Sequence, residues 1–169
     1  RGITKTKNTR LAALLRLLPS MAVATVTHVT LWEALPGKSA EMMATAAKAV
    51  ELNKKLGMQA VTAVDSRGRL HFAMAFEDWA QWGEYQAKAA ADADMQAFVQ
   101  GYSTNPSAVQ LDSFMLNQPL PGAPGNVYNV FIWESYEGRS ADMMTKAMEA
   151  AAIHQADGVS IAVNVDQLG

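Results

Sequence analysis

An internal repeat constrains this 169-residue chain more than any other feature: residues 27–68 recur, without a gap, as residues 128–169. Fourteen of the 42 aligned positions are identical, including Trp32, which returns 101 positions later as Trp133. Two copies of one segment are expected to form the same supersecondary unit. The repeat therefore indicates a fold that is built from two related units.

The pattern within the first copy predicts a strand, a helix and a second strand. Residues 29–32 are β-branched and aromatic, as is typical of a strand. Ser39 is in position to cap a helix over residues 40–56, and Gly57 is placed to end that helix in the left-handed conformation. A second strand is expected over residues 58–65.

Beyond the first copy, the chain continues with a hairpin, further helix and a fourth strand. Residues 70–76 read as the hairpin partner of the second strand, residues 78–90 and 95–99 as helix, and residues 107–116 as a strand. The resulting order, β-α-β-β-α-β, is that of a ferredoxin-like unit, an antiparallel sheet with helices on one face. We therefore predict an α+β fold: a ferredoxin-like unit duplicated in tandem, in which the two uncovered sheet faces close into an α+β barrel.

Four regions follow from this assignment. Residues 1–24, which lack acidic side chains, are an N-terminal extension or a targeting segment. Residues 25–118 are the first repeat, residues 119–126 a Pro/Gly-rich linker, and residues 127–169 a partial second repeat. Because the second copy stops in its hairpin turn, we expect the complete protein to continue for about 50 residues.

The composition of the chain argues against several classes of binding partner and location. The net charge is −2 at pH 7 and no basic stripe is present, so nucleic acid is not an expected partner. The absence of cysteine excludes disulfides and thiolate chemistry, and it fits a cytoplasmic location. No apolar run reaches the ~18–20 residues of a membrane span. A homo-oligomer is compatible with the predicted barrel.

Several short motifs resemble one known superfamily. They are Trp32-Glu33, Pro36-Gly37-Lys38, Phe76-Glu77-Asp78 and the run from Asp94 to Phe98. On these residues the chain resembles the dimeric α+β barrel superfamily, specifically its NIPSNAP-like and antibiotic-biosynthesis-monooxygenase-like members. The resemblance implies a barrel cavity, and the relatives include cofactor-free oxygenases that act on polyphenolic substrates and haem-degrading enzymes. The haem-degrading pattern of cooperating Asn, His and Trp residues is not matched, so no catalytic residue is carried over.

Strand alternation predicts which side chains line that cavity. We expect Val29 and Leu31 to pack beneath the helices, because their counterparts in the second copy are also aliphatic. Phe72 and Met74 are expected to join them there. The opposite face, the barrel interior, would then hold two candidate catalytic residues, His28 and His71, and the candidate ligand-binding residues Trp32, Gln59, Asn129 and Trp133, with Gln110 or Asp112 as additions from the fourth strand.

Each of these residues also has a structural interpretation. The two histidines could act as acid, base or metal ligand. Alternatively, His28 lies at the rim near the start of its strand, and His71 is hydrogen-bonded or solvated. The tryptophans could stack on a ligand or anchor a core. No metal site and no cofactor are predicted, since neither metal-ligand spacing nor a phosphate-binding loop occurs.

The predicted function is that of a small-molecule-binding α+β barrel protein. If it is catalytic, we expect a cofactor-independent oxygenase or isomerase that acts on a hydrophobic or aromatic compound. The alternative is a non-catalytic structural or interaction module with a packed barrel interior.

Overall fold

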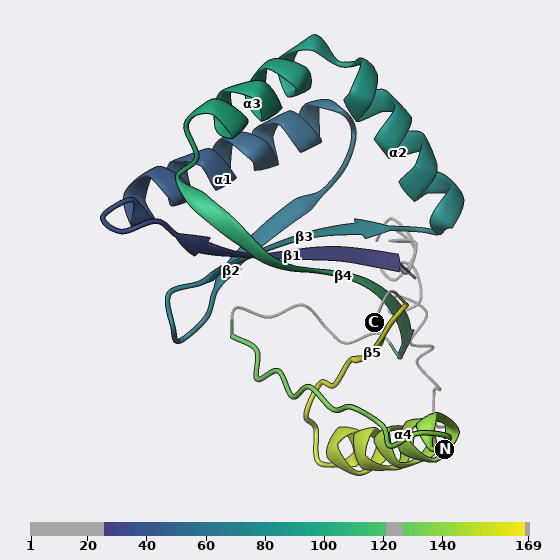
Figure 1. Cartoon of the computed structure of the whole chain (residues 1–169). Coiled ribbons are helices and arrows are strands. Elements are labelled where there is room, and N and C mark those ends of the chain that lie inside the picture. Colours follow the sequence, from purple (N-terminus) through teal and green to yellow (C-terminus); the bar gives the residue numbers. More distant parts are fainter. Residues whose placement is uncertain (1–25, 121–126, 168–169) are drawn as a thin grey trace, which may run out of the picture.

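A computed structural model describes residues 26–120 and 127–167 of the chain. These residues form an α+β fold with one five-stranded antiparallel sheet and four helices (Figure 1). The strands lie in the order β2-β3-β1-β4-β5. Along the chain the elements are β1 (Val26–Ala34), α1 (Ser39–Lys55), β2 (Ala60–Val64), β3 (Leu70–Phe76), α2 (Trp79–Ala91), α3 (Ala93–Thr104), β4 (Ala108–Leu120), α4 (Ser140–Ala156) and β5 (Val163–Asp166).

The sheet places β1 at its centre, between β3 and β4. The third strand lies between the first and second, as the sequence predicts for a β-α-β-β-α-β unit. Helices α1, α2 and α3 cover one face of the sheet, whereas α4 lies apart from them, beyond the β4–β5 edge (Figure 1). The predicted N-terminal segment, residues 1–24, lies outside the described residues, as does most of the linker. The fourth strand is longer than expected and runs through the first two linker positions to Leu120.

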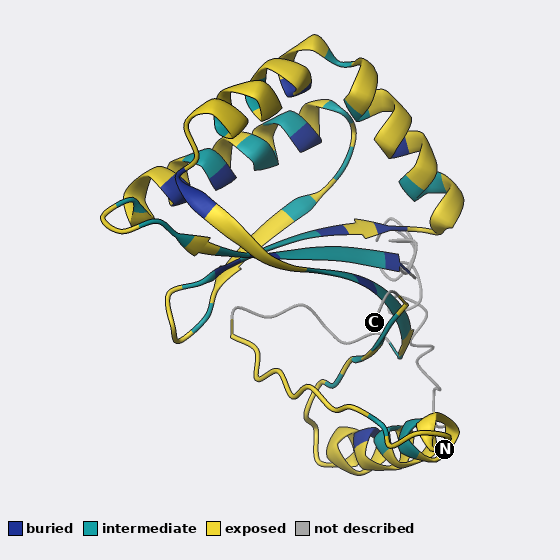
Figure 2. Ribbon diagram, viewed as in Figure 1, coloured by how far each residue is buried: buried dark blue, intermediate teal, exposed yellow. Residues whose placement is uncertain are grey.

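Nine of the twelve buried hydrophobic side chains among the described residues form two clusters on the helix-covered face (Figure 2). Cluster 1 lies under α2 and contains Val26, Met74, Phe76, Tyr85 and Met115. Cluster 2 lies under α1 and contains Met42, Ala46, Leu70 and Ala108.

Helix boundaries follow local chemistry in most places. Asp78 and Asp92 cap α2 and α3, and their carboxylates accept from the backbone N–H groups three residues later, at 2.8 Å in both cases. Gly57 ends α1 with a φ of +83°, as predicted. The prediction for Ser39 is wrong: it is the first helical residue of α1, and Lys38 precedes it without a side-chain cap.

The second copy of the repeat matches the first in its helix but not in its first strand. Both bounds of α4 lie 101 positions after those of α1, and Gly158 repeats the positive φ of Gly57. Residues 127–136, however, belong to no helix or strand. Strand β5 pairs with β4 at the edge of the sheet, and its register shifts between Asn117 and Leu120. For residues 159–166 the sequence leaves three outcomes open: an exposed edge, irregular pairing, or a strand parallel to residues 128–133. The irregular pairing is what occurs, over residues 163–166.

One prediction about β1 is wrong: its two alternating sets of side chains are reversed. His28 is opposite Met74 of β3 and Met115 of β4, and both methionines belong to cluster 1 with Tyr85 of α2. Because directly opposed residues on adjacent strands point to the same face, His28 faces the helices. Trp32 does so too, since it packs against cluster 2.

Val29 and Leu31 consequently lie on the face away from the helices, which they share with His71. For β3 the prediction is correct, since Phe72 and Met74 do pack on the helix side. The error has a physical cause. Both alternating sets of β1 contain apolar side chains, and the second-copy residues that were used to choose between them form no strand.

No helix within residues 26–120 and 127–167 has both the length and the apolar character to cross a membrane.

Candidate functional site

A polar group on the helix side of the sheet separates the two hydrophobic clusters. It comprises His28 and Thr30 of β1 and Ser113 of β4, which is the register partner of Thr30. The Nε2 atom of His28 lies 2.9 Å from the Ser113 Oγ. These side chains lie between the sheet and the covering helices.

His28 has one ring nitrogen without a partner. Its Nδ1 atom is buried and forms no hydrogen bond with any described residue. Burial lowers the pKa of His28 from its ordinary value of 6.5, so the imidazole is neutral at neutral pH. When Nε2 donates its proton to Ser113, Nδ1 presents a free lone pair. A neutral imidazole of this kind can accept a hydrogen bond or a proton from a bound molecule.

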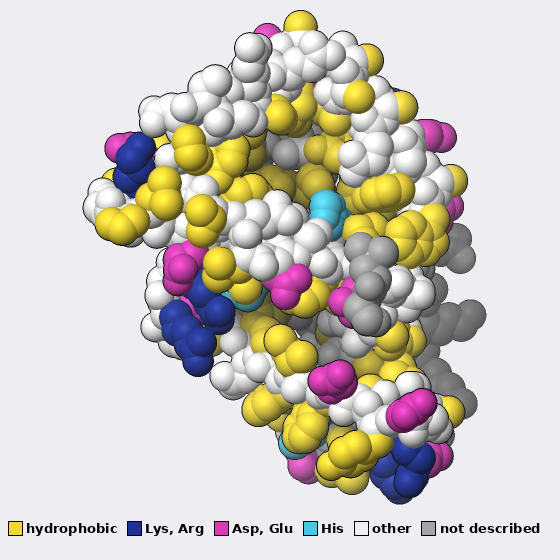
Figure 3. Space-filling view, viewed as in Figure 1, with side chains coloured by type: hydrophobic (Ala, Val, Ile, Leu, Met, Phe, Trp, Pro, Cys, Tyr) yellow, Lys and Arg dark blue, Asp and Glu magenta, His cyan; other side chains and the backbone are white. Residues whose placement is uncertain are grey.

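A second buried polar atom without a partner belongs to the same region. The Nε1 of Trp82, in α2, has no acceptor among the described residues. Trp82 packs against cluster 1, whose Met74 and Met115 flank His28 in the sheet. The space-filling view shows a hollow between the helices and the sheet with hydrophobic side chains inside it (Figure 3). A donor and an acceptor without partners therefore adjoin one apolar cluster.

Trp32 closes the other end of the polar group. Its Nε1 donates to the Thr30 Oγ1 at 2.8 Å, and its ring meets the Tyr102 ring of α3 edge-on, with centroids 5.5 Å apart. The indole N–H of Trp32 is thus hydrogen-bonded and its ring is packed against Tyr102, which favours the core-anchor interpretation of this residue.

His71 lies on the opposite face and has a structural partner. Its Nε2 is 3.4 Å from Oδ2 of Asp65, an atom that also accepts from the Arg69 side chain at 2.7 Å. The other carboxylate oxygen of Asp65, Oδ1, accepts from the backbone N–H groups of Arg67 and Arg69. The Arg69 guanidinium and these hydrogen bonds hold the pKa of Asp65 far below its usual range. His71 therefore belongs to the hydrogen-bonded group around Asp65 that stabilises the β2–β3 hairpin. Because this group lies on the opposite face of the sheet, His71 cannot share a site with His28.

The remaining predicted ligand-binding residues are not brought together. Gln59 is exposed and precedes β2, at a shallow hollow beside the end of α1. Asn129 and Trp133 are exposed in the segment that forms no strand. No group of three or more histidine, aspartate or glutamate side chains suited to a metal ion occurs in the described ranges.

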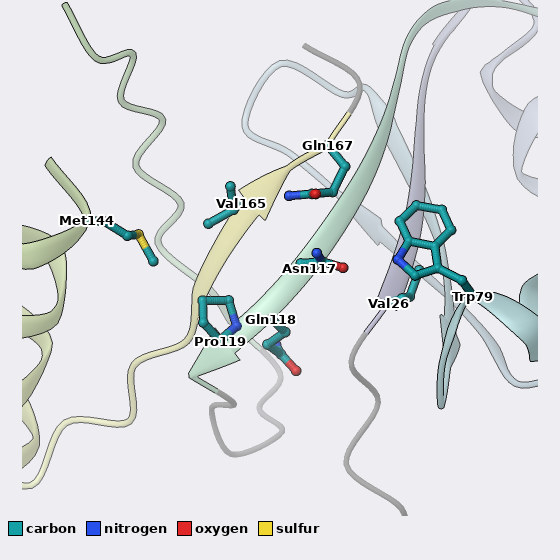
Figure 4. A pocket seen from close by; sticks show the side chains of 8 residues that line it. All are labelled: Val26, Trp79, Asn117, Gln118, Pro119, Met144, Val165 and Gln167. Carbon is teal, nitrogen blue, oxygen red and sulfur yellow. The ribbon is translucent and has the colours of Figure 1, made fainter. Parts of the chain in front are cut away.

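A larger groove lies between the unit that ends with β4 and the later elements α4 and β5. It has a volume of about 560 Å³ and is bordered by α2, β1, β4, β5 and α4 (Figure 4). Val26, at its inner wall, belongs to cluster 1, and Trp79 meets Trp82 edge-on with ring centroids 5.9 Å apart. The groove is therefore adjacent to the hydrophobic cluster that surrounds His28. Its lining residues are Val26, Trp79, Asn117, Gln118, Pro119, Met144, Val165 and Gln167.

Three features of this region depend on tertiary structure, and the sequence did not reveal them. Ser113 bonds His28 only because β4 pairs with β1, a pairing of residues 85 positions apart. The missing acceptor of the Trp82 indole N–H depends on what surrounds α2. The buried Asn53 accepts from the Tyr85 hydroxyl at 2.6 Å, which links α1 to α2.

No family model, no curated protein and no solved structure matches this chain.

Proposed function

We propose that this protein binds a small hydrophobic or aromatic molecule on the helix side of its sheet, at His28. The observation that carries the proposal is the pair of buried polar atoms without partners, Nδ1 of His28 and Nε1 of Trp82, beside one apolar cluster. Native proteins rarely leave such atoms unsatisfied, since each costs about 1–3 kcal/mol. A ligand with an aromatic body and one or two polar substituents would satisfy both atoms and cover the cluster.

The strand order and the single helix-covered face are compatible with a relationship to the dimeric α+β barrel superfamily. The cavity expected from that relationship lies on the other face of the sheet, so a site at His28 rests on its own geometry. A cofactor-independent oxygenase or isomerase is the catalytic form of this proposal. The neutral imidazole of His28 then acts as the base: Nδ1 removes a proton from a phenolic hydroxyl or from a carbon beside a carbonyl. The anion either regains this proton from His28 at another carbon, which is an isomerisation, or forms a C–O bond to O₂ through a carbon that bears hydrogen. In the second case the peroxide anion takes the proton back from His28, and the hydroperoxide loses water to leave a carbonyl.

The test is a thermal-shift screen of phenols, quinones and related aromatic compounds on the full chain. Compounds that raise the melting temperature are then measured on His28→Gln, which keeps a polar side chain of similar size but lacks the imidazole. His71→Gln is the matched control, because His71 lies on the other face of the sheet. We expect the ligand-induced shift to fall in His28→Gln and to persist in His71→Gln.

Nuclear magnetic resonance gives an independent readout of the same site. The Nδ1 and Nε2 signals of His28 should move on addition of a compound that binds, while those of His71 and His154 should not. Equal ligand shifts in wild type and His28→Gln, with unmoved His28 signals, would remove His28 from any binding site.

The alternative, a non-catalytic interaction module, rests on a separate observation. A row of large apolar side chains between β4 and α4 is exposed to solvent, and exposed rows of this kind are typical of protein contacts. The two functions are not exclusive, because the row and His28 belong to different parts of the structure.

A further inference from the structure

We propose that residues 129–134, the aromatic segment, form an intermolecular strand on the β2 edge of a second copy of this chain. The aromatic segment contains Val130, Phe131, Ile132 and Trp133, each about three-quarters or more exposed. It belongs to no strand among the described elements, and the burial colouring shows it as exposed chain between β4 and α4 (Figure 2). Four consecutive large apolar residues in contact with water are a strong thermodynamic reason to associate.

The repeat indicates which structure the aromatic segment takes when it is paired. Its counterpart in the first copy is β1, the central strand of the sheet, with Trp32 in the place of Trp133. Both segments are rich in β-branched and aromatic side chains, which favour a pleated, paired conformation. The first copy supplies strand neighbours on both sides of β1, whereas the aromatic segment has no described strand beside it. An added strand in a second chain would meet that requirement.

The sheet offers one apolar edge of suitable length. Strand β2 is the end strand next to β3, so its outer edge presents backbone groups without a described partner strand. Its side chains Val61 and Val64 are 65% and 53% exposed. A hollow of about 310 Å³ lies along the start of this edge, lined by Val50, Lys54, Met58 and Val61 among others. Edges of this kind recruit an extended segment by strand addition, in which pockets beside the edge receive alternate side chains.

Side-chain alternation and charge select one arrangement. In β1 the counterpart of Trp133 faces the helices, so Phe131 and Trp133 would point toward α1 and the hollow. Ile132 would then share the other face with Val61. If the aromatic segment runs antiparallel to β2, Glu134 comes near Lys54 at the start of the edge, which places opposite charges together.

The area is sufficient for a dimer of ordinary size. Each large aromatic side chain can bury about 150–250 Å². The two aromatic and two aliphatic residues of the aromatic segment, together with the apolar edge of β2, can approach the ~800 Å² per partner of a specific interface. A two-fold axis uses each surface twice, since the segment of each chain binds the β2 edge of the other.

The test is the oligomeric state of the full chain by sedimentation velocity at micromolar concentration. We expect a particle of twice the 18.2 kDa chain mass. Val130→Pro removes a backbone donor from the aromatic segment, and Val61→Lys places a charge on the receiving edge; both should yield monomers. The matched control is Val99→Lys on α3, a valine of similar exposure, 54%, which should remain dimeric. Circular dichroism verifies that each variant is folded.

Cross-linking tests the specific pairing, because the chain has no cysteine of its own. Chains with Ile132→Cys and chains with Val61→Cys are mixed and oxidised with diamide, and we expect the mixed disulfide to predominate over either self-pair. A monomer at all concentrations would overturn the proposal, as would a dimer that Val61→Lys and Val99→Lys affect equally. A prevalence of Ile132→Cys self-pairs would overturn the strand addition and indicate contact between two aromatic segments.

Discussion

At the scale of single residues, the protonation of His28 makes the stability of the fold depend on pH. Its ring lies between the sheet and the helices, and burial lowers its pKa below the ordinary value of 6.5. The unfolded chain therefore binds a proton at a higher pH than the folded chain does. The contribution of neutral His28 to the free energy of unfolding is fully present above the pKa that His28 has in the unfolded chain. It is lost as the pH falls from that value to the lower pKa of His28 in the folded chain.

We predict that His28→Gln removes this part of the pH dependence. The free energy of unfolding of the wild type, measured in urea, should fall from pH 7.5 toward pH 5, and the variant should show a smaller fall over the same range. His154→Gln is the control, because His154 is exposed at the end of α4. An equal slope in wild type and His28→Gln would show that His28 titrates alike in the folded and unfolded chains.

Tyr85 and Asn53 give a second prediction at this scale. The Tyr85 hydroxyl donates to the buried Asn53 Oδ1 at 2.6 Å, so Tyr85→Phe leaves that amide oxygen without this donor. We expect a loss of about 1–3 kcal/mol in the free energy of unfolding, the cost of an unsatisfied buried polar group. Tyr136→Phe removes an exposed hydroxyl and should change stability by less than about 0.5 kcal/mol. Comparable losses in the two variants would show that the Asn53 bond contributes little.

The sequence predicts residue roles well where the chemistry is local. Gly57 and Asp78 act within a few positions of themselves, at a helix end and a helix start, and both were found from the sequence. The face of His28 was missed because it depends on which of two mixed sets of β1 side chains meets the helices. Its bond to Ser113 and the missing partner of the Trp82 indole depend on distant parts of the chain, which no local pattern records.

At the scale of elements, α1 and α4 show how tertiary contacts act on similar sequences. Both have 17 residues and the same flanking glycines, and both carry an acidic residue in the first turn. Yet α1 buries Met42, Ala46 and Asn53, whereas α4 buries Ala151. The sequence predicts the two helices equally well, because helix formation follows local propensity and glycine placement. It cannot predict the difference in burial, which arises from the sheet that lies beneath α1.

Two glycines give a matched prediction for the helices. Gly57 adopts a φ of +83°, a region that costs an alanine about 1–2 kcal/mol. Gly101 lies inside α3 with ordinary φ, and a Cβ there would meet open space. We expect Gly57→Ala to destabilise the protein by about that amount and Gly101→Ala to stabilise it by about 0.5–1 kcal/mol. Thermal melts of both variants test this, and a stable Gly57→Ala would mean that the α1–β2 turn can change its conformation.

At the scale of the whole molecule, the buried core belongs to the first repeat, residues 25–118. Apart from Ala151, all the buried hydrophobic residues among the described positions lie between Val26 and Met115. Strand β5 adds to this unit at its edge, through an irregular ladder to β4. The sequence predicted the intact first unit and its strand order. It did not predict that β5, from the second copy, would pair with β4 and join the sheet of the first copy.

This distribution leads to a prediction about truncation. A chain that ends after residue 120 keeps both hydrophobic clusters, the hydrogen bond between α1 and α2, and all the strand pairs of β1, β2 and β3. It loses only the ladder to β5 and the contacts of α4, so the last residues of β4 should fray while the rest unfolds cooperatively. We expect its melting temperature to lie within a few degrees of that of the full chain. The control ends after residue 105, which removes β4 and with it Ala108 and Met115, one residue from each cluster; it should not fold. Loss of a cooperative transition in the longer truncation would show that the second half of the chain contributes to the core and does not merely border it.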